Sequence, residues 1–217
     1  MKNRRSRKGL LFVLEGIDGS GKTAVAELVV TRLTEEGYDA VKLHEPTSES
    51  EWGRQIRDRS PRGGLSPAEE LELFVRDREW HVRNRIRPAL NAGKIIVLDR
   101  YFFANGAYQS ASTGIHWREI LRRNREGIHP PEPDLVFVLD VPVETGLARV
   151  LGREYQSNEQ FEKIERLVKV RQAYLEMAHE DAGLFEIVDA TQTLEQVADQ
   201  VHRRILEFLG RKGRKTG

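Results

Sequence analysis

The sequence predicts a three-layer α/β/α fold around a five-stranded parallel sheet. Five short runs rich in Val, Ile, Leu and Phe are too apolar to be strands with one face in water. Longer amphipathic segments alternate with these runs, which is typical of a parallel sheet covered by helices on both faces. A length of 217 residues suits one domain better than two, so we expect a single domain with its core at about residues 9–210.

Each apolar run is assigned to a strand and each amphipathic segment to a helix, in the order of the chain. The predicted strands are 10–15, 40–44, 94–99, 135–140 and 184–189. The predicted helices are 22–37, 66–92, 117–125, 143–151, 158–181 and 194–209. The stretches 58–66 and 152–158 are predicted to be loops, because the first contains glycine and proline and the second is polar.

The composition excludes several classes of protein. No apolar run approaches the ~20 residues that cross a bilayer, and no signal-peptide core precedes the first strand, so we expect a cytoplasmic protein. The chain has no cysteine, which excludes disulfides and thiolate metal sites. Its net charge of +1 argues against nucleic acid as the main partner, although the tails 1–8 and 211–217 are basic.

The stretch EGIDGSGKT matches the phosphate-loop pattern G-x-x-x-x-G-K-S/T. It follows the first predicted strand and opens the first predicted helix, which is the context that this loop requires. Backbone N–H groups and the helix N-terminus can then surround phosphate oxygens, with Lys22 as a catalytic cation and the Thr23 hydroxyl as a ligand of Mg²⁺. The residues predicted to bind ATP are Gly16, Ile17, Asp18, Gly19, Ser20, Gly21, Lys22 and Thr23. This loop alone does not distinguish a kinase from a GTPase, a motor or a regulator.

Polar residues that follow other strands indicate where the rest of the site lies, because ligands bind beyond the carboxyl ends of parallel strands. Asp99 and Asp140 each end an apolar run and suit a carboxylate near Mg²⁺. We favour Asp99, since Arg100 follows it directly and a cation there can offset charge on a transferring phosphoryl group. For Asp140, the start of a turn is the alternative interpretation.

The predicted helix 66–92 carries two stripes of side chains. One stripe is apolar, and the other, next to it, contains Phe74, Arg78, His81 and Arg85. An aromatic ring with an arginine one turn later can stack on a planar base and hydrogen-bond its edge. The alternative is a solvated arginine face with Phe74 packed inward, and the spacing does not decide between the two.

Five segments in the same order resemble the motifs of the thymidylate kinase family. They are FVLEGIDGSGKT, EPTSESEWGRQIR, LELFVRDREWH, DRYFFANGAYQ and PDLVFVLDVPVETGLAR, which together extend through nearly the whole chain. The resemblance implies a P-loop nucleoside monophosphate kinase fold. It also implies Mg²⁺-dependent transfer of phosphate from ATP to dTMP, giving dTDP, by a protein that is usually a homodimer.

The resemblance further assigns roles to residues of the acceptor site. Phe74 would stack on thymine and Arg78 would hydrogen-bond the base, while Asn105 would face the pyrimidine and Tyr108 the deoxyribose. Phosphate contacts fall to Arg57 and Arg100, and Asp18 and Glu45 line the same region. The loop 152–158 would be a lid over ATP, with Arg153 as its catalytic cation.

The chain departs from the family pattern at three places. Thr47-Ser48 replace a pair of glycines, Ala104 replaces a serine, and the lid run 159–162 lacks its arginine, so that Arg153 or Arg149 would serve instead. Two alternatives to a thymidylate kinase therefore stay open. One is a kinase for another nucleoside monophosphate, or for a deoxynucleoside with Glu45 as its base. The other is a non-catalytic regulator that binds nucleotides.

Overall fold

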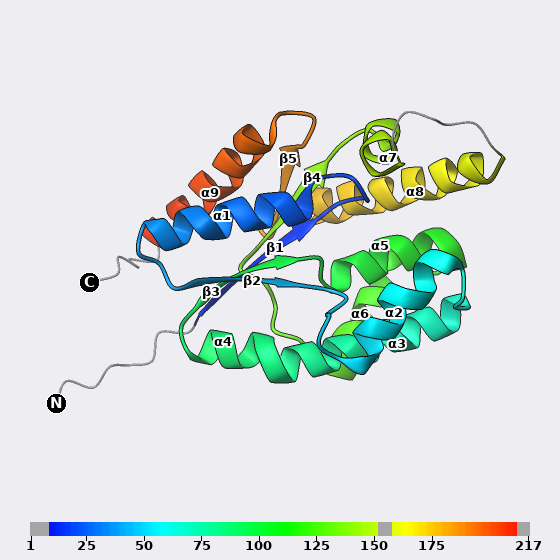
Figure 1. The fold of residues 1–217 in the computed structure, drawn as a ribbon, viewed down its shortest axis with the longest axis horizontal. Coiled ribbons are helices and arrows are strands. Elements are labelled where there is room, and N and C mark those ends of the chain that lie inside the picture. The colour runs from blue at the N-terminus through cyan, green and yellow to red at the C-terminus, as the bar shows by residue number, and fades with distance from the viewer. Residues whose placement is uncertain (1–8, 152–157, 212–217) are drawn as a thin grey trace.

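The computed structural model describes residues 9–151 and 158–211 and contains a five-stranded parallel sheet with helices on both faces (Figure 1). The strand order is β2-β3-β1-β4-β5. The strands are β1 (Leu10–Glu15), β2 (Ala40–His44), β3 (Ile95–Asp99), β4 (Leu135–Asp140) and β5 (Phe185–Asp189). The predicted fold class is confirmed, and the five strands differ from the predicted ones by at most one residue at an end.

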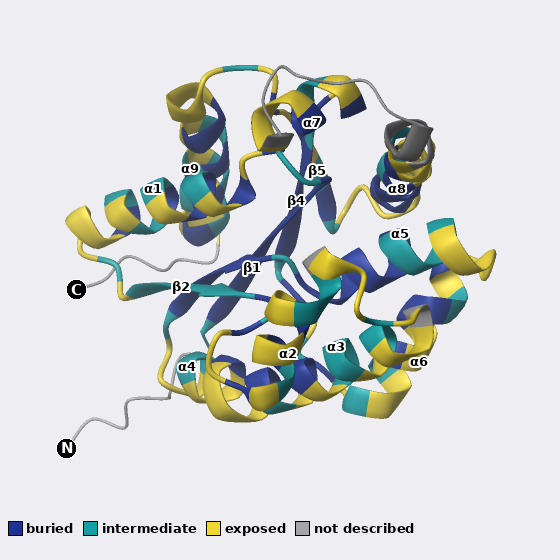
Figure 2. Ribbon diagram, turned by 45° about the vertical axis from the view of Figure 1, so that its right-hand side comes forward, coloured by how far each residue is buried: buried dark blue, intermediate teal, exposed yellow. Residues whose placement is uncertain are grey.

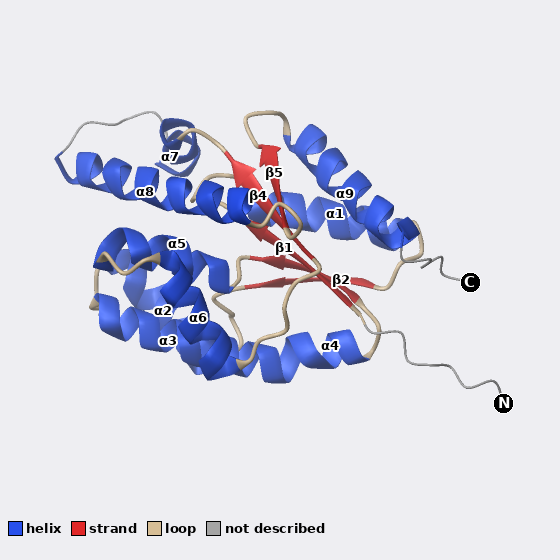
Figure 3. Ribbon diagram, turned by 180° about the vertical axis from the view of Figure 1, so that it is seen from behind, coloured by secondary structure: helices blue, strands red, loops and turns tan. Residues whose placement is uncertain are grey.

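Helices flank the sheet in two layers, which Figure 3 shows from behind. On one face, α1 and α9 pack together, while α4 and α8 contact strands from the other face. The helices of the first half are α1 (Lys22–Glu35), α2 (Glu51–Arg59), α3 (Pro67–His81), α4 (Arg87–Asn91) and α5 (Phe102–Thr113). Those of the second half are α6 (Trp117–Ile128), α7 (Val143–Leu151), α8 (Asn158–Glu180) and α9 (Leu194–Arg211).

The strands form the centre of the core because their side chains are apolar on both faces. Every residue of β1 and β3 is buried, and so are the first five residues of β4 (Figure 2). In the parallel register, Leu14 of β1 pairs with Asp99 of β3, and Glu15 pairs with Val138 of β4. The polar residues that end these strands therefore meet at one edge of the sheet.

The predicted helix 66–92 is one continuous helical run. It consists of α3, a π-helical turn η2 (Val82–Ile86) and α4. Ser66 caps the run: its hydroxyl accepts a hydrogen bond from the Glu69 N–H, and the Glu69 carboxylate accepts one from the Ser66 N–H. This capping box fixes the start of the helix that carries Phe74 and Arg78.

The sequence analysis was wrong to assign no helix to residues 51–59 and 102–113, which form α2 and α5. It was also wrong to begin a loop at residue 58, because α2 continues to Arg59 and a 3₁₀ turn η1 (Ser60–Arg62) follows. In α2 the start is set by the Ser50 side chain, which accepts from the Gly53 N–H. In α5 the side chain of the N-cap residue Tyr101 makes no capping hydrogen bond, and the helix packs closely against distant side chains at Gly106.

No helix among residues 9–151 and 158–211 is long and apolar enough to cross a membrane. The cytoplasmic location stays a prediction. The basic tails predicted at 1–8 and 211–217 lie outside the described residues, apart from Arg211, which ends α9. The predicted organisation as one domain, and the expected absence of nucleic-acid partners, also stay predictions.

Candidate active site

The phosphate loop lies between the end of β1 at Glu15 and the start of α1 at Lys22, as predicted. Its shape requires glycine at two positions in particular. Gly21, which caps α1, has a φ of 91°, in the left-handed region that other residues avoid. At Gly19, with a φ of 79°, an added Cβ would lie 2.0 Å from the Gly146 carbonyl oxygen. The loop therefore leaves its backbone N–H groups free of bulky side chains.

Lys22 is buried and its ammonium group lies across the loop. The Nζ donates to the carbonyl oxygens of Gly16 at 3.0 Å and Ile17 at 2.9 Å, and to the Ser20 hydroxyl at 3.3 Å. Burial and the nearby Arg100 lower the pKa of Lys22 to about 8. A dianionic phosphate in the loop would reverse this shift, because an opposite charge favours the ammonium form.

Thr23 and Asp99 bring two oxygen groups together beside the loop. The Thr23 hydroxyl donates to Asp99 Oδ2 at 2.5 Å, and the Asp99 side chain is buried at the end of β3. Oxygen ligands are what Mg²⁺ prefers, and its usual shell needs only one or two protein groups besides water and phosphates. These residues fit the metal. Asp140, the other candidate, instead forms an ion pair with Arg171 of α8 at 2.6 Å.

Arg100 is held in an unusual backbone conformation next to this pair. Its φ is 71°, which is uncommon for a residue other than glycine. Its guanidinium donates to Asp18 Oδ1 at 2.8 Å and lies 5.1 Å from the centre of the Tyr108 ring. Burial alone would raise the pKa of Asp18, but Arg100 and Lys22 lower it below the usual value, so the carboxylate is ionised.

Two adjoining pockets in this region share part of their lining, and we call them together the cleft. The pocket of about 750 Å³ lies over the phosphate loop, and the pocket of about 410 Å³ lies between α3, α5 and α8. Both are lined by Asp18, Ser60, Phe74 and Arg100. The first pocket also holds Lys22, Thr23, Glu45, Arg57 and Asp99, and the second also holds Arg78, Asn105 and Tyr108. The predicted site residues in the described part of the chain line one of these pockets or both, except for Gly16, Ile17 and Ser20 of the phosphate loop.

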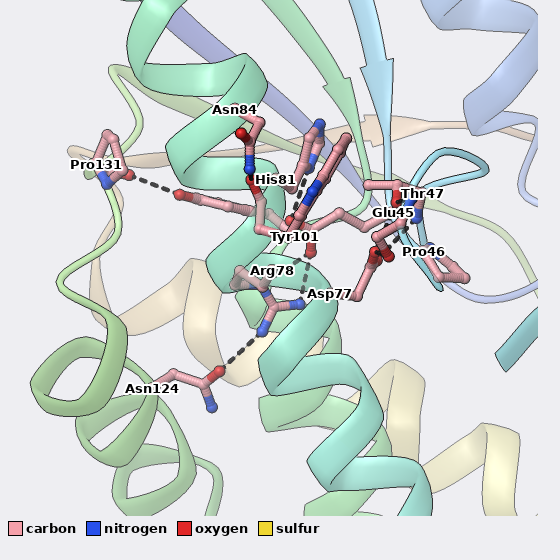
Figure 4. Close-up of polar contacts among 12 residues, drawn as sticks. Glu45, Pro46, Thr47, Asp77, Arg78, His81, Asn84, Tyr101, Asn124 and Pro131 are labelled. Carbon is pink, nitrogen blue, oxygen red and sulfur yellow. Dashed lines mark hydrogen bonds and ion pairs between the residues drawn. The ribbon is translucent and has the colours of Figure 1, made fainter. Parts of the chain in front are cut away.

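Arg78 is the largest fully buried side chain at this cleft (Figure 4). Its Nε and Nη2 donate to Glu45 Oε2 at 2.8 and 2.7 Å, and its Nη1 donates to Asn124 Oδ1 at 2.8 Å. His81 Nδ1 lies 3.1 Å from Glu45 Oε1. A solvated arginine face is therefore the wrong interpretation for Arg78, which is only 1% exposed. Phe74 is partly exposed and lines the cleft.

The remaining candidates are one exposed arginine, one buried asparagine and the arginines proposed for the lid. Arg57 is exposed on α2 and donates to the Pro46 carbonyl oxygen at 2.7 Å. Asn105 is buried on α5. Arg153 falls outside the described residues, as do residues 152–157 of the predicted lid. Arg149 of α7 donates to the carbonyl oxygens of Gly19 at 3.3 Å and Ala190 at 3.0 Å, next to the phosphate loop.

Known proteins match this chain over most of its length. A sequence profile of the thymidylate kinase family matches residues 14–201. The chain is 45% identical to a probable thymidylate kinase of Archaeoglobus fulgidus over 203 residues, which cover 94% of this chain and 98% of that protein. It is 40% identical to a thymidylate kinase of Xanthomonas euvesicatoria over 201 residues, or 93% of this chain and 85% of the other.

The chain belongs to the thymidylate kinase family. The resemblance recognised in its motifs is confirmed. One departure from the family pattern now has a structural account: Thr47 donates from its N–H and its hydroxyl to Asp77 of α3, at 2.8 and 2.6 Å. The segment in which this chain departs from the family pattern is therefore hydrogen-bonded to α3.

Sequence reasoning missed several residues of the cleft. Asn124 and Asp77 are buried polar groups on predicted helices, and each bonds a residue 30 or more positions away. Lys163 and Arg166 of α8 line the pocket that holds Tyr108. An arginine and a lysine three residues apart on a polar helix carry no sign of this position, because exposed helix faces are rich in such residues.

Proposed function

We propose that this protein is a nucleoside monophosphate kinase that transfers the terminal phosphate of ATP to dTMP and forms dTDP. The observation that carries the proposal is the shared lining of the two pockets of the cleft. A phosphate loop with Lys22 opens into a pocket with an aromatic wall and a buried arginine, and Arg100 lines both parts. This arrangement supports the placing of donor and acceptor phosphates side by side. Membership of the thymidylate kinase family supports the choice of acceptor.

On the donor side, the loop residues 16–23 would hold the ATP phosphates. Their backbone N–H groups and the N-terminus of α1 favour negative charge, and Lys22 adds a full cation. Thr23 and Asp99 would hold Mg²⁺, which when bound supplies positive charge to the β- and γ-phosphates. The hydrogen bond between these two residues already places both oxygens beside the loop.

On the acceptor side, Phe74 would stack on the thymine ring and Arg78 would donate to its edge. Asn105 would face the pyrimidine from α5. Burial raises the pKa of Tyr108 to about 12, so its phenol is neutral and its ring can pack on the deoxyribose. Arg57 and Arg100 would contact the acceptor phosphate, with Asp18 orienting Arg100 through their 2.8 Å ion pair. Glu45 would line the same region and orient Arg78 through two hydrogen bonds.

The transfer needs no strong base, because the attacking group is an ionised phosphate oxygen. What it needs is alignment and neutralisation of charge that spreads over the moving phosphoryl group. Arg100 supplies a cation where the two pockets adjoin, and Lys22 supplies one in the pocket over the phosphate loop. We propose Arg153 on the lid as a further cation, with Arg149, bonded to the Gly19 carbonyl oxygen, as the alternative.

The contacts of Glu45 argue against a deoxynucleoside kinase. A 5′-hydroxyl acceptor would need Glu45 as a general base. Although burial alone would raise its pKa, Arg78 and His81 lower it, and both carboxylate oxygens are engaged by these residues. A carboxylate held in this way is a weak proton acceptor. The paired Thr23 and Asp99 likewise argue against a regulator that has lost its catalytic groups.

The experiment that tests the proposal measures ADP release with ATP and Mg²⁺ against dTMP, dUMP, UMP, CMP, AMP and thymidine. The highest kcat/KM is expected with dTMP. Preference for another monophosphate would keep the kinase and refute the acceptor assignment. ATP binding without turnover on any acceptor would favour the regulator instead.

The acceptor pocket is tested by Phe74→Ala. Loss of base stacking costs about 1–3 kcal/mol, so KM for dTMP is expected to rise by roughly 5- to 150-fold while KM for ATP stays within about twofold. Ile187→Ala on β5 is a matched control, because that side chain is 50% exposed and does not line the cleft. An unchanged KM for dTMP in Phe74→Ala would show that the base binds elsewhere.

A further inference from the structure

Asn124 of α6 is a buried polar residue with no part in the phosphate chemistry. Its side chain is 4% exposed and makes two hydrogen bonds: Nδ2 donates to the Ile120 carbonyl oxygen at 2.9 Å, and Oδ1 accepts from Arg78 at 2.8 Å. The first bond sets the orientation of the amide, because only Nδ2 can donate to a carbonyl. The oxygen is thereby directed at the guanidinium of Arg78, as Figure 4 shows.

Arg78 is therefore anchored from two different parts of the chain. Glu45, which follows β2, accepts from Nε and Nη2, and Asn124 accepts from Nη1. A guanidinium is planar and has five N–H groups, so these three bonds leave one N–H on each Nη nitrogen. Anchors on two sides of a planar group fix its orientation, and with it the direction of the two remaining donors.

The direction of the two remaining N–H groups of Arg78 decides which base fits, because a guanidinium can donate hydrogen bonds but cannot accept them. A pyrimidine with a 4-oxo group presents an acceptor to them, whereas a 4-amino group would present donors to donors and leave buried groups unpaired. Selection between the two classes of base depends on where the two N–H groups point. Glu45 bonds one side of the guanidinium and cannot alone stop the opposite side from turning.

We propose that Asn124 is a positioning residue for base selection: it aligns Arg78 so that the cleft accepts 4-oxo pyrimidine nucleotides and rejects 4-amino ones. The inference rests on the proposed function, since it concerns the acceptor of that reaction. It assigns a role in specificity to α6, a helix that otherwise lies away from the phosphate loop.

The test is Asn124→Leu, which removes the acceptor and keeps an apolar side chain of similar size. Hydrogen bonds to charged groups contribute about 1.5–3 kcal/mol, so KM for dTMP is expected to rise about 10- to 100-fold. The ratio of kcat/KM for dTMP over dCMP should fall by a similar factor, while kcat and KM for ATP stay within about twofold. A merely structural role would not move this ratio.

Two further variants allow the proposal to be tested even if Asn124→Leu fails to fold. Asn124→Asp loses the bond to the Ile120 carbonyl but offers Arg78 a carboxylate, which the guanidinium attracts, and it is expected to keep the dTMP/dCMP ratio within about threefold of the wild type. Asn84→Leu is the matched control, because Asn84 makes the same bond to the carbonyl four residues earlier, at 2.7 Å, on an exposed position of η2. It should behave as the wild type.

The outcomes separate this inference from the proposed function. If the wild type turns over dTMP and Asn124→Leu retains the wild-type ratio, the positioning role is refuted and the function stands. Loss of the ratio in Asn124→Asp as well as in Asn124→Leu also refutes it, because the oxygen would then not be the cause. If the wild type does not phosphorylate dTMP, both conclusions fail together.

Discussion

Glu15 is a fully buried carboxyl that connects three parts of the active site. It ends β1 and precedes the phosphate loop. Its Oε1 accepts from the Tyr101 N–H at 2.9 Å, and its Oε2 accepts from the Tyr174 hydroxyl of α8 at 2.8 Å. Tyr101 directly follows Arg100, whose φ is 71°. These bonds support the strained turn that aims Arg100 into the cleft.

The charge of Glu15 makes stability depend on pH. Burial raises its pKa to about 7, although Arg100, the Tyr101 and Tyr174 bonds and Lys22 act in the opposite direction. A pKa raised in the folded state gives stability that is present below the unfolded pKa, about 4.3, and is lost as pH rises through 7. Folding is therefore favoured when Glu15 is protonated, and the Tyr174 hydroxyl can then turn to accept.

We expect Glu15→Gln to remove this dependence. Between about pH 5 and pH 8, the free energy of unfolding of the wild type should fall by about 2–3 kcal/mol relative to that of Glu15→Gln. Urea unfolding at several pH values measures the difference. Glu195→Gln, at an exposed position on α9, should follow the wild type throughout. Parallel curves for the wild type and Glu15→Gln would contradict the assigned pKa.

At the scale of elements, the sequence predicts best what local pattern determines. The strands are predictable because they are buried on both faces and therefore almost wholly apolar. The two helices that the sequence analysis missed, α2 and α5, depend on a cap or on tertiary packing rather than on a repeating apolar pattern. In α2, nine mostly polar residues start at a single serine cap. In α5, a Cβ at Gly106 would lie 2.9 Å from side-chain atoms of Leu121 and Met177, so distant packing holds the helix.

The segment before α2 depends on one residue of α3. Asp77, 1% exposed, accepts hydrogen bonds from the Thr47 N–H, the Thr47 hydroxyl and the Ser50 hydroxyl, at 2.8, 2.6 and 2.5 Å. Ser50 in turn caps α2, which carries Arg57. Asp77 thus connects the helix of the base pocket to the helix with the proposed phosphate-binding arginine.

We expect Asp77→Asn to weaken the hydrogen bonds between α3 and the segment before α2. If the amide oxygen keeps the bond from the Thr47 N–H, the amide nitrogen faces the Thr47 and Ser50 hydroxyls, which then lose their charged acceptor, so the free energy of unfolding should fall by about 2–3 kcal/mol. The position of α2 should change with it, raising KM for dTMP more than KM for ATP. Asp58→Asn is the control, because Asp58 is exposed and forms a surface ion pair with Arg62 at 3.1 Å. Equal effects of the two variants on stability would contradict the role of Asp77.

At the scale of the whole molecule, the cleft combines parts that the sequence predicts with parts that it does not. The phosphate loop is local, and its glycines and Lys22 follow a spacing that the backbone geometry requires. The support of Arg78 is not local, because its partners are 33 and 46 positions away. The spacing of Phe74 and Arg78 left base binding and a solvated face both open, the family resemblance favoured base binding, and nothing in the sequence indicated that Asn124 would hold Arg78.

A homodimer, which the family resemblance implies, has a candidate surface behind this cleft. A shallow apolar groove of about 150 Å³ is formed by α3, α5 and α6. Its apolar lining includes Leu71, Val75, Ile115, Ile120 and Ile128. Asn124 also lines it, so the same residue borders the groove and bonds Arg78. We propose that a second copy covers the groove, because apolar patches rimmed by polar groups are common at protein interfaces.

The dimer is tested by Val75→Glu, which places a charge in the groove. Burying that charge without a partner costs several kcal/mol, so the variant should be a monomer of 24.9 kDa where the wild type has the mass of two chains. Light scattering over a range of concentrations measures the mass. Val168→Glu is the control, since Val168 is 50% exposed on α8 and lies outside the groove. A wild type that is a monomer throughout, or a Val75→Glu variant that stays dimeric, would exclude this surface. If the interface also stabilises the position of α6, the monomeric variant will show a raised KM for dTMP. In the monomer, the hydrogen bond between Asn124 and Arg78 would then be weaker.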